Sequence, residues 1–168
     1  MGTLVERLAA AQIGGTFNQY RDPRLAERLA RYLDARAEAP LLLVGEAAGY
    51  RGARISGIPF TSERQLTGTG PAEATATIVH RVLADLGLEE SVLLWNVVPT
   101  HPGTESTNRV PTKGEIDASA PFAFELARGR RVLAVGRVAE AALEAPYVRH
   151  PSHGGASAFR ETLRACLT

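Results

Sequence analysis

The chain has 168 residues, a formal net charge of +1 and 45% hydrophobic residues, which predicts one folded domain over 1–168 and excludes a polycation or a disordered chain. No apolar run approaches the roughly 20 residues of a membrane helix, and the N-terminus lacks a signal-peptide pattern, so we expect no membrane partner. A single cysteine, Cys166, excludes an internal disulfide and a thiolate cluster, and it fits a cytoplasmic location.

The first half of the chain predicts helices that alternate with buried strands. A helix start at 22–23, an Asp followed by Pro, precedes apolar residues at helical spacing. The continuous apolar run 39–46 predicts a buried strand, and a second such run follows at 91–98. Between these strands, a helix is predicted from Pro71 to about Gly87.

The second half continues this alternation. Thr112 and Glu115 form a capping box for a helix that Pro121 is expected to kink or restart. The remaining predicted elements are a strand at 130–136, a helix at 137–144, a short strand at 147–153 and a helix at about 156–166.

Strands that alternate with helices indicate βαβ units and a parallel sheet. We therefore predict an α/β fold, a three-layer α/β/α sandwich around a central, mainly parallel four-stranded sheet. Ligands of such sheets bind beyond the carboxyl ends of the strands. The segments that follow the strands are 46–50, 96–101, 136–137 and 150–155. Most of the polar residues of interest lie in these segments, so one edge of the sheet is the predicted site.

Glu46, Asn96 and His150 each end a predicted strand at this edge. A carboxylate can deprotonate a water or stabilise a cation, and an Asn amide can bond an amide-like edge. A His can donate to a developing oxyanion. Together they suit a bond cleavage whose leaving group is an amide-like anion, although each residue type is also common in purely structural roles.

Five segments in conserved order along the chain resemble motifs of the uracil-DNA glycosylase superfamily, and most closely its family-4-like branch. They are GEAAG (45–49), GIPF (57–60), the segment from Trp95 to Ile116, RRVLAVGRVAEAAL (130–143) and HPSH (150–153).

This resemblance implies a role for each matched residue. Glu46 would position or activate the attacking water, and His150 would steady negative charge on the leaving base. Phe60 would stack on the extruded base, and Asn96 would bond the pyrimidine edge. Backbone amides of the 46–50 loop, with Ala47 and Tyr50 among its residues, would bind a uracil carbonyl.

The resemblance also implies a DNA contact at the second motif. Ser152, Gly154 and Gly155 would grip phosphates through hydroxyl and backbone donors. His153 could contact phosphate, assist His150 or do neither. Arg160 belongs to a basic tail that starts at Arg128 and has seven Arg against three Glu, so we expect it to bind DNA as well.

The sequence departs from the family-4 pattern in three places. Thr100 and Ser119 stand where cysteine ligands of an iron–sulfur cluster would align, so no metal and no cofactor are expected. Ala48 replaces a proline and is expected to loosen its loop. No leucine follows His153 to wedge into a helix, so we expect a preference for uracil in single-stranded or mispaired DNA. We also expect the protein to be a monomer.

The leading hypothesis is a monofunctional DNA glycosylase of base excision repair that hydrolyses the N-glycosidic bond of uracil, hypoxanthine, xanthine or another deaminated base. One alternative is a catalytically weak or silent nucleic-acid-binding member of the same fold. The other is a small-molecule hydrolase that uses the same loops. Ser152 has no convincing acid partner in the sequence, which argues against the hydrolase.

Overall fold

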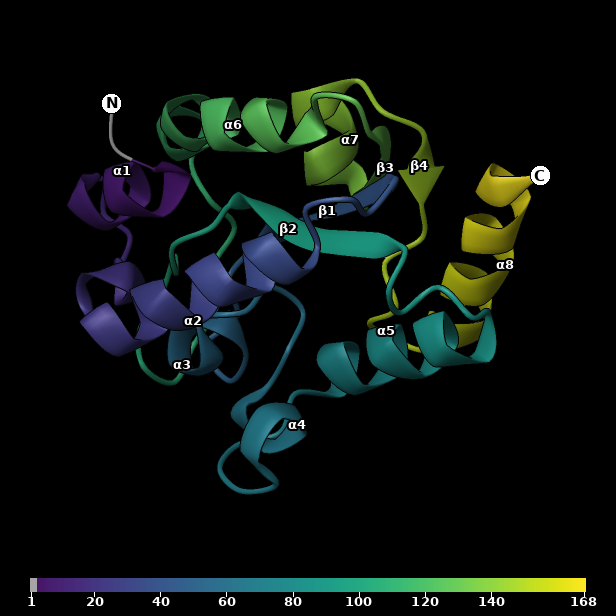
Figure 1. Cartoon of the computed structure of the whole chain (residues 1–168), viewed down its shortest axis with the longest axis horizontal. Coiled ribbons are helices and arrows are strands. Elements are labelled where there is room, and N and C mark those ends of the chain that lie inside the picture. Colours follow the sequence, from purple (N-terminus) through teal and green to yellow (C-terminus); the bar gives the residue numbers. More distant parts are fainter. Residues whose placement is uncertain (1–2) are drawn as a thin grey trace.

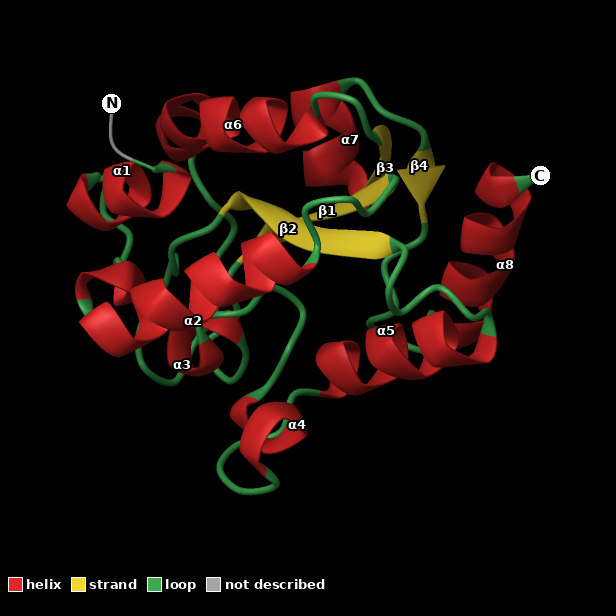
Figure 2. Cartoon of the chain, viewed as in Figure 1, coloured by secondary structure: helices red, strands yellow, loops and turns green. Residues whose placement is uncertain are grey.

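The computed structural model describes residues 3–168 and consists of a central sheet between two layers of helices (Figures 1 and 2). The strands are β1 (Leu41–Ala47), β2 (Val92–Val98), β3 (Arg131–Val135) and β4 (Tyr147–Val148). The α-helices are α1 (Leu4–Ala10), α2 (Pro23–Ala35), α3 (Ala53–Ser56), α4 (Glu63–Thr67), α5 (Ala74–Asp85), α6 (Lys113–Ala127), α7 (Arg137–Leu143) and α8 (Ala156–Leu167), and a 3₁₀ turn, η1, spans Gln19–Arg21.

The four strands are all parallel and lie in the order β2-β1-β3-β4, which confirms the predicted three-layer α/β/α architecture. The register pairs Gly45 of β1 with Asn96 of β2. Because paired residues of neighbouring strands point to the same face of a sheet, these two residues share a face. Within residues 3–168, no helix is long and apolar enough to cross a bilayer.

Alternation along β1 divides the hydrophobic core between the two faces of the sheet. Leu42 and Val44 pack against residues of α1, α2, α6 and α7, whereas Leu41 and Leu43 pack against residues of α5 and α8. Both faces of the central strands are therefore covered, which explains their continuous apolar runs.

Three predicted boundaries need correction. The helix expected from Pro71 begins at Ala74, because the carbonyls of Gly70 and Pro71 accept hydrogen bonds from Arg64 and hold this segment against α4. Helix α6 runs unbroken through Pro121. The fourth strand covers only residues 147–148 of the predicted 147–153, because the chain turns away where the Arg149 N–H donates to Thr162.

Candidate active site

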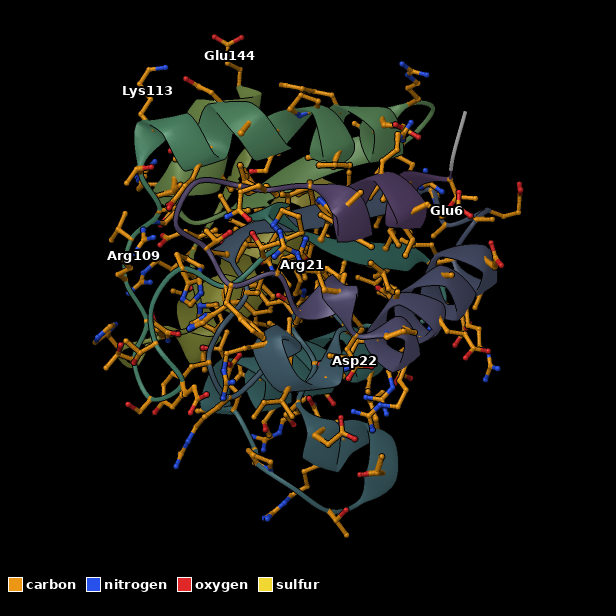
Figure 3. The ribbon with its side chains drawn as sticks, turned by 90° about the vertical axis from the view of Figure 1, so that its left-hand side faces the viewer. Glu6, Arg21, Asp22, Arg109, Lys113 and Glu144 are labelled. Carbon is orange, nitrogen blue, oxygen red and sulfur yellow. The ribbon has the colours of Figure 1, made fainter. Side chains whose placement is uncertain are left out.

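The carboxyl ends of the strands open into a cavity of about 630 Å³, a size typical of small-ligand sites. Its walls include Glu46, Phe60, Asn96 and His150, so the four residues expected to handle the base and the water lie together. The other predicted residues on its walls are Ala47, Tyr50, Ser152 and His153. Arg109, another wall residue, is exposed and is labelled at the left edge of the view in Figure 3.

Gly45 makes room for the ring of Phe60. A Cβ at Gly45 would lie 2.2 Å from Cζ of Phe60 and 2.9 Å from Oδ1 of Asn96. The aromatic ring and the amide therefore meet over the backbone of β1. Phe60 has a φ of 52°, in the left-handed region that is strained for a bulky residue. Hydrogen bonds from Ser56 Oγ to the Thr61 carbonyl (2.6 Å) and between Thr61 Oγ1 and His80 Nε2 (2.9 Å) brace this loop.

Asn96 is only 4% exposed, and its side-chain amide has no hydrogen-bond partner within residues 3–168. The Asn96 amide is not among the fully buried polar atoms without a partner, so it reaches the cavity, where a ligand can bond it. Glu46 is half-buried, and burial raises the pKa of its carboxyl group. A raised pKa makes the ionised carboxylate a stronger base towards water.

His150 is oriented by the turn that follows it. The backbone N–H of Ser152 donates to Nδ1 of His150 (3.1 Å), and Ser152 Oγ lies 2.8 Å from the same nitrogen. A backbone N–H only donates, so Nδ1 carries no proton and the neutral ring keeps its proton on Nε2. Burial, together with the charge of Arg149, lowers the pKa of His150 and favours this neutral ring.

The two glycines after His153 have structural functions. Gly154 has a φ of 73°, and a Cβ at Gly155 would lie 2.4 Å from the His150 carbonyl oxygen. Both glycines therefore keep the 150–155 turn tight and lead into the N-terminus of α8. Neither glycine lines the cavity, and Arg160 lies on α8 in an ion pair with Asp85 (2.7 Å). DNA contacts by these three residues stay predictions.

The 46–50 loop is not loosened by Ala48. The N–H of Ala48 donates to the Val98 carbonyl (3.2 Å), and Nδ1 of the fully buried His101 lies 2.7 Å from the Ala48 carbonyl oxygen. Asn108 Oδ1 accepts from the Tyr50 N–H (2.9 Å). Neighbouring loops thus do the bracing for which a proline was expected, and the Tyr50 amide is already bonded.

Thr100 and Ser119, at the positions of the missing cysteines, take part in hydrogen bonds inside the chain. Thr100 Oγ1 lies 2.6 Å from Oγ1 of Thr16, and Ser119 Oγ donates to the Glu115 carbonyl (2.7 Å). Both hydroxyl residues are fully buried. The Thr100 contact links the segment after β2 to the segment before η1, whereas the Ser119 bond stays within α6.

Sequence reasoning missed several polar wall residues, among them Glu73, Asn108 and Arg109. Asn108 and Arg109 lie inside the segment 95–116, so that motif could have drawn attention to them. Glu73 precedes α5 outside every motif, and no signal in the sequence marks it.

Comparison with known proteins agrees with this geometry. The sequence matches the model of the uracil DNA glycosylase superfamily over residues 32–164. The fold is similar to the crystal structure of wild-type SMUG2 from Pedobacter heparinus, with a TM-score of 0.67 and 13% identity over 99% of this chain and 97% of that chain. No curated protein matches the sequence. Because the family model spans most of its length and the site lies within that span, the chain belongs to the uracil DNA glycosylase superfamily.

Proposed function

We propose that the protein is a monofunctional DNA glycosylase that hydrolyses the N-glycosidic bond of uracil or another deaminated base. The observation that carries this proposal is the meeting of Glu46, Phe60, Asn96 and His150 in one cavity at the carboxyl edge of the sheet. Membership of the superfamily supports DNA as the substrate.

Recognition begins with a base turned out of the DNA, since a base inside a duplex cannot be reached. The Phe60 ring offers a stacking face worth roughly 1–3 kcal/mol. The unbonded Asn96 amide offers a donor and an acceptor to the base edge. The N–H groups of His153 and Gly154 make no hydrogen bond within residues 3–168, and with the N-terminus of α8 they are donors suited to a nearby phosphate.

Bond cleavage separates charge, because the electron pair of the C1′–N bond leaves with the base and the sugar becomes an oxocarbenium ion. The Nε2–H of His150 would donate to the base anion. The Glu46 carboxylate would stabilise the sugar cation and take a proton from the water that adds to C1′. The products are a free base and an abasic site.

The strand itself should stay uncut. Strand cleavage by a glycosylase needs an amine that forms a Schiff base with the sugar. The single lysine of the chain, Lys113, lies on α6 with its amine 2.5 Å from Asp117, and it is not on the cavity walls. Hydrolysis without strand scission is therefore the expected outcome.

The test is a screen of oligonucleotides that each carry one uracil, hypoxanthine or xanthine, in single strands and in mispairs. Base release is measured directly by chromatography, and abasic sites are revealed by alkali. We expect release of at least uracil, most readily from single strands and mispairs. Intact oligonucleotides at high enzyme concentration would contradict hydrolysis and favour a silent binding protein.

A further inference from the structure

A second acidic residue faces the cavity from outside the sequence motifs. Glu73, just before α5, lies over the backbone of Gly49 and Gly52. A Cβ at Gly49 would be 2.4 Å from Oε2 of Glu73, and a Cβ at Gly52 would be 2.7 Å from the same atom. The carboxyl group of Glu73 can therefore lie against the backbone beside Tyr50 only because Gly49 and Gly52 have no side chains.

The Glu73 carboxyl group has no partner within residues 3–168. It makes no ion pair or hydrogen bond, and it does not cap α5, although Glu73 occupies the N-cap position. The residue is half-buried, and burial alone raises the pKa of its carboxyl group. An unpartnered, partly buried carboxyl group in a functional cavity calls for a ligand that completes its hydrogen bonds.

If the ligand is DNA, few of its chemical groups can donate a hydrogen bond to Glu73. An ionised carboxylate only accepts hydrogen bonds. Phosphodiesters and the deoxyribose units within a strand offer acceptors only, whereas the bases carry N–H groups. The group that could complete the hydrogen bonds of Glu73 is therefore an N–H on a base.

Deamination changes which bases offer such a group at the ring. The ring nitrogen at the pairing edge of cytosine or adenine presents a lone pair, whereas that of uracil or hypoxanthine carries a hydrogen. The Asn96 amide cannot separate the two classes alone, because an unbonded amide can rotate to exchange its donor and acceptor. A carboxylate cannot make this exchange. Cytosine and adenine also carry an exocyclic amine at this edge, so it is a carboxylate opposite the ring nitrogen that separates the classes, attracted by the N–H and repelled by the lone pair.

We propose that Glu73 is a specificity-determining residue, whose carboxylate accepts a hydrogen bond from the ring N–H of a deaminated base and disfavours the parent base. The inference rests on the proposed function for the presence of an extruded base in the cavity. It adds the residue by which the cavity would select a deaminated base over its parent base.

The test measures binding rather than turnover, in a Glu46→Gln background that stops hydrolysis. The probes are single-stranded oligodeoxyadenylates with one central uracil, hypoxanthine or cytosine. Their affinity for the protein is measured by fluorescence anisotropy. We expect the oligonucleotides with uracil or hypoxanthine to bind at least about tenfold more tightly than the one with cytosine. Adding Glu73→Gln should remove most of this preference while binding persists, because a glutamine amide can rotate.

Two further variants separate this role from effects on folding or overall charge. Gly52→Ala should displace the flexible end of Glu73 and reduce the preference as well. Glu105→Gln removes the same charge from an exposed loop side chain off the cavity walls and should leave the preference unchanged. Thermal unfolding checks that each variant is folded.

The outcomes distinguish this inference from the proposed function. Equal binding of the uracil and cytosine probes by the Glu46→Gln protein would overturn the role of Glu73. A preference for uracil that survives the added Glu73→Gln change would overturn it as well. Both results leave uracil release by the wild-type protein to be judged separately. Loss of the preference in Glu73→Gln supports the inference even if the wild-type protein releases no base.

Discussion

The backbone N–H of Ser152 and Nδ1 of His150 are 3.1 Å apart, and this contact determines where the histidine keeps its proton. The neutral ring then has Nε2–H as its donor, and Nε2 has no partner within residues 3–168. A leaving base is an anion, so a fixed N–H donor nearby stabilises the state in which the glycosidic bond breaks.

His150→Ala should lower the rate of uracil release by about 10²–10³-fold, the usual effect of removing one such donor. His150→Gln can place an amide N–H near the same position and should recover part of the rate. Single-turnover release from a uracil-containing single strand measures both. Glu105→Gln, at an exposed side chain off the cavity walls, is the control and should keep the wild-type rate. Equal rates for the alanine variant and the wild-type protein would remove His150 from the mechanism.

The lowered pKa of His150 also links it to stability. In the unfolded chain His150 takes up a proton near pH 6.5, whereas in the folded protein it stays neutral to lower pH. The stability that the neutral His150 contributes is therefore fully present above pH 6.5 and is lost as the pH falls. Urea unfolding of the wild-type protein between pH 7 and pH 5 should show this loss, and His150→Gln should show less of it. Identical pH profiles would argue against a buried neutral ring.

Glu46→Gln should reduce base release by about 10²–10⁴-fold, because the amide cannot take a proton from water. DNA binding should persist. The raised pKa of Glu46 predicts that the wild-type rate rises with pH as the carboxyl group ionises, above the pH range of an ordinary glutamate. The residual rate of the variant should lack this rise. A pH–rate profile of both proteins on one oligonucleotide tests the assignment.

Gly45→Ala should disturb stacking and base reading together. The added Cβ would come 2.2 Å from the Phe60 ring and 2.9 Å from Asn96 Oδ1, so at least one of these groups must move. We expect a loss of about 1–3 kcal/mol in the free energy of unfolding, as for other overpacked sites, and weaker binding of uracil-containing strands. Gly114→Ala, where the nearest atom is 4.0 Å away, is the control and should leave both quantities nearly unchanged.

Glu115→Ala should cost about 1–3 kcal/mol of stability, because the buried carboxylate accepts charge-assisted and backbone hydrogen bonds that are lost, while its partner Arg109 stays in contact with solvent. Glu115 is 2% exposed, pairs with Arg109 (2.7 Å) and accepts the N–H of Gly15 (3.1 Å). The Arg109 guanidinium lowers the pKa of Glu115 to about 2 from 4.5, so its stabilisation is present above pH 4.5 and is lost as the pH falls towards 2.

Chemical unfolding at pH 7 and pH 3 measures the effect of Glu115→Ala, and the penalty should be smaller at pH 3. Asp117→Ala removes an exposed partner of Lys113 and should cost less than about 1 kcal/mol. Similar penalties for the two variants would contradict a buried role for Glu115.

Local signals predicted the sheet and part of the cavity well. The runs at 41–47 and 92–98 are apolar because helices cover both of their faces, so composition alone reveals them. The residues at the carboxyl ends of parallel strands meet at one edge of the sheet, which is why the sequence alone predicts that Glu46 and Asn96 lie together.

Glu73 and the start of α5 could not be found in this way. The burial of Glu73 depends on the missing side chains of Gly49 and Gly52, and the segment around Pro71 depends on hydrogen bonds from Arg64. These contacts join different elements of the fold. Periodicity within one segment carries no information about them.

Among residues 3–168, Phe60 and His153 are two of the three non-glycine residues with left-handed backbone, and both lie on the cavity walls. Such conformations cost of order 1–3 kcal/mol each and persist only because surrounding contacts impose them. The free-energy cost of these two conformations is therefore incurred during folding, before DNA binds. An incoming strand finds a receptor whose shape is already fixed, so most of the rearrangement on binding must be made by the DNA.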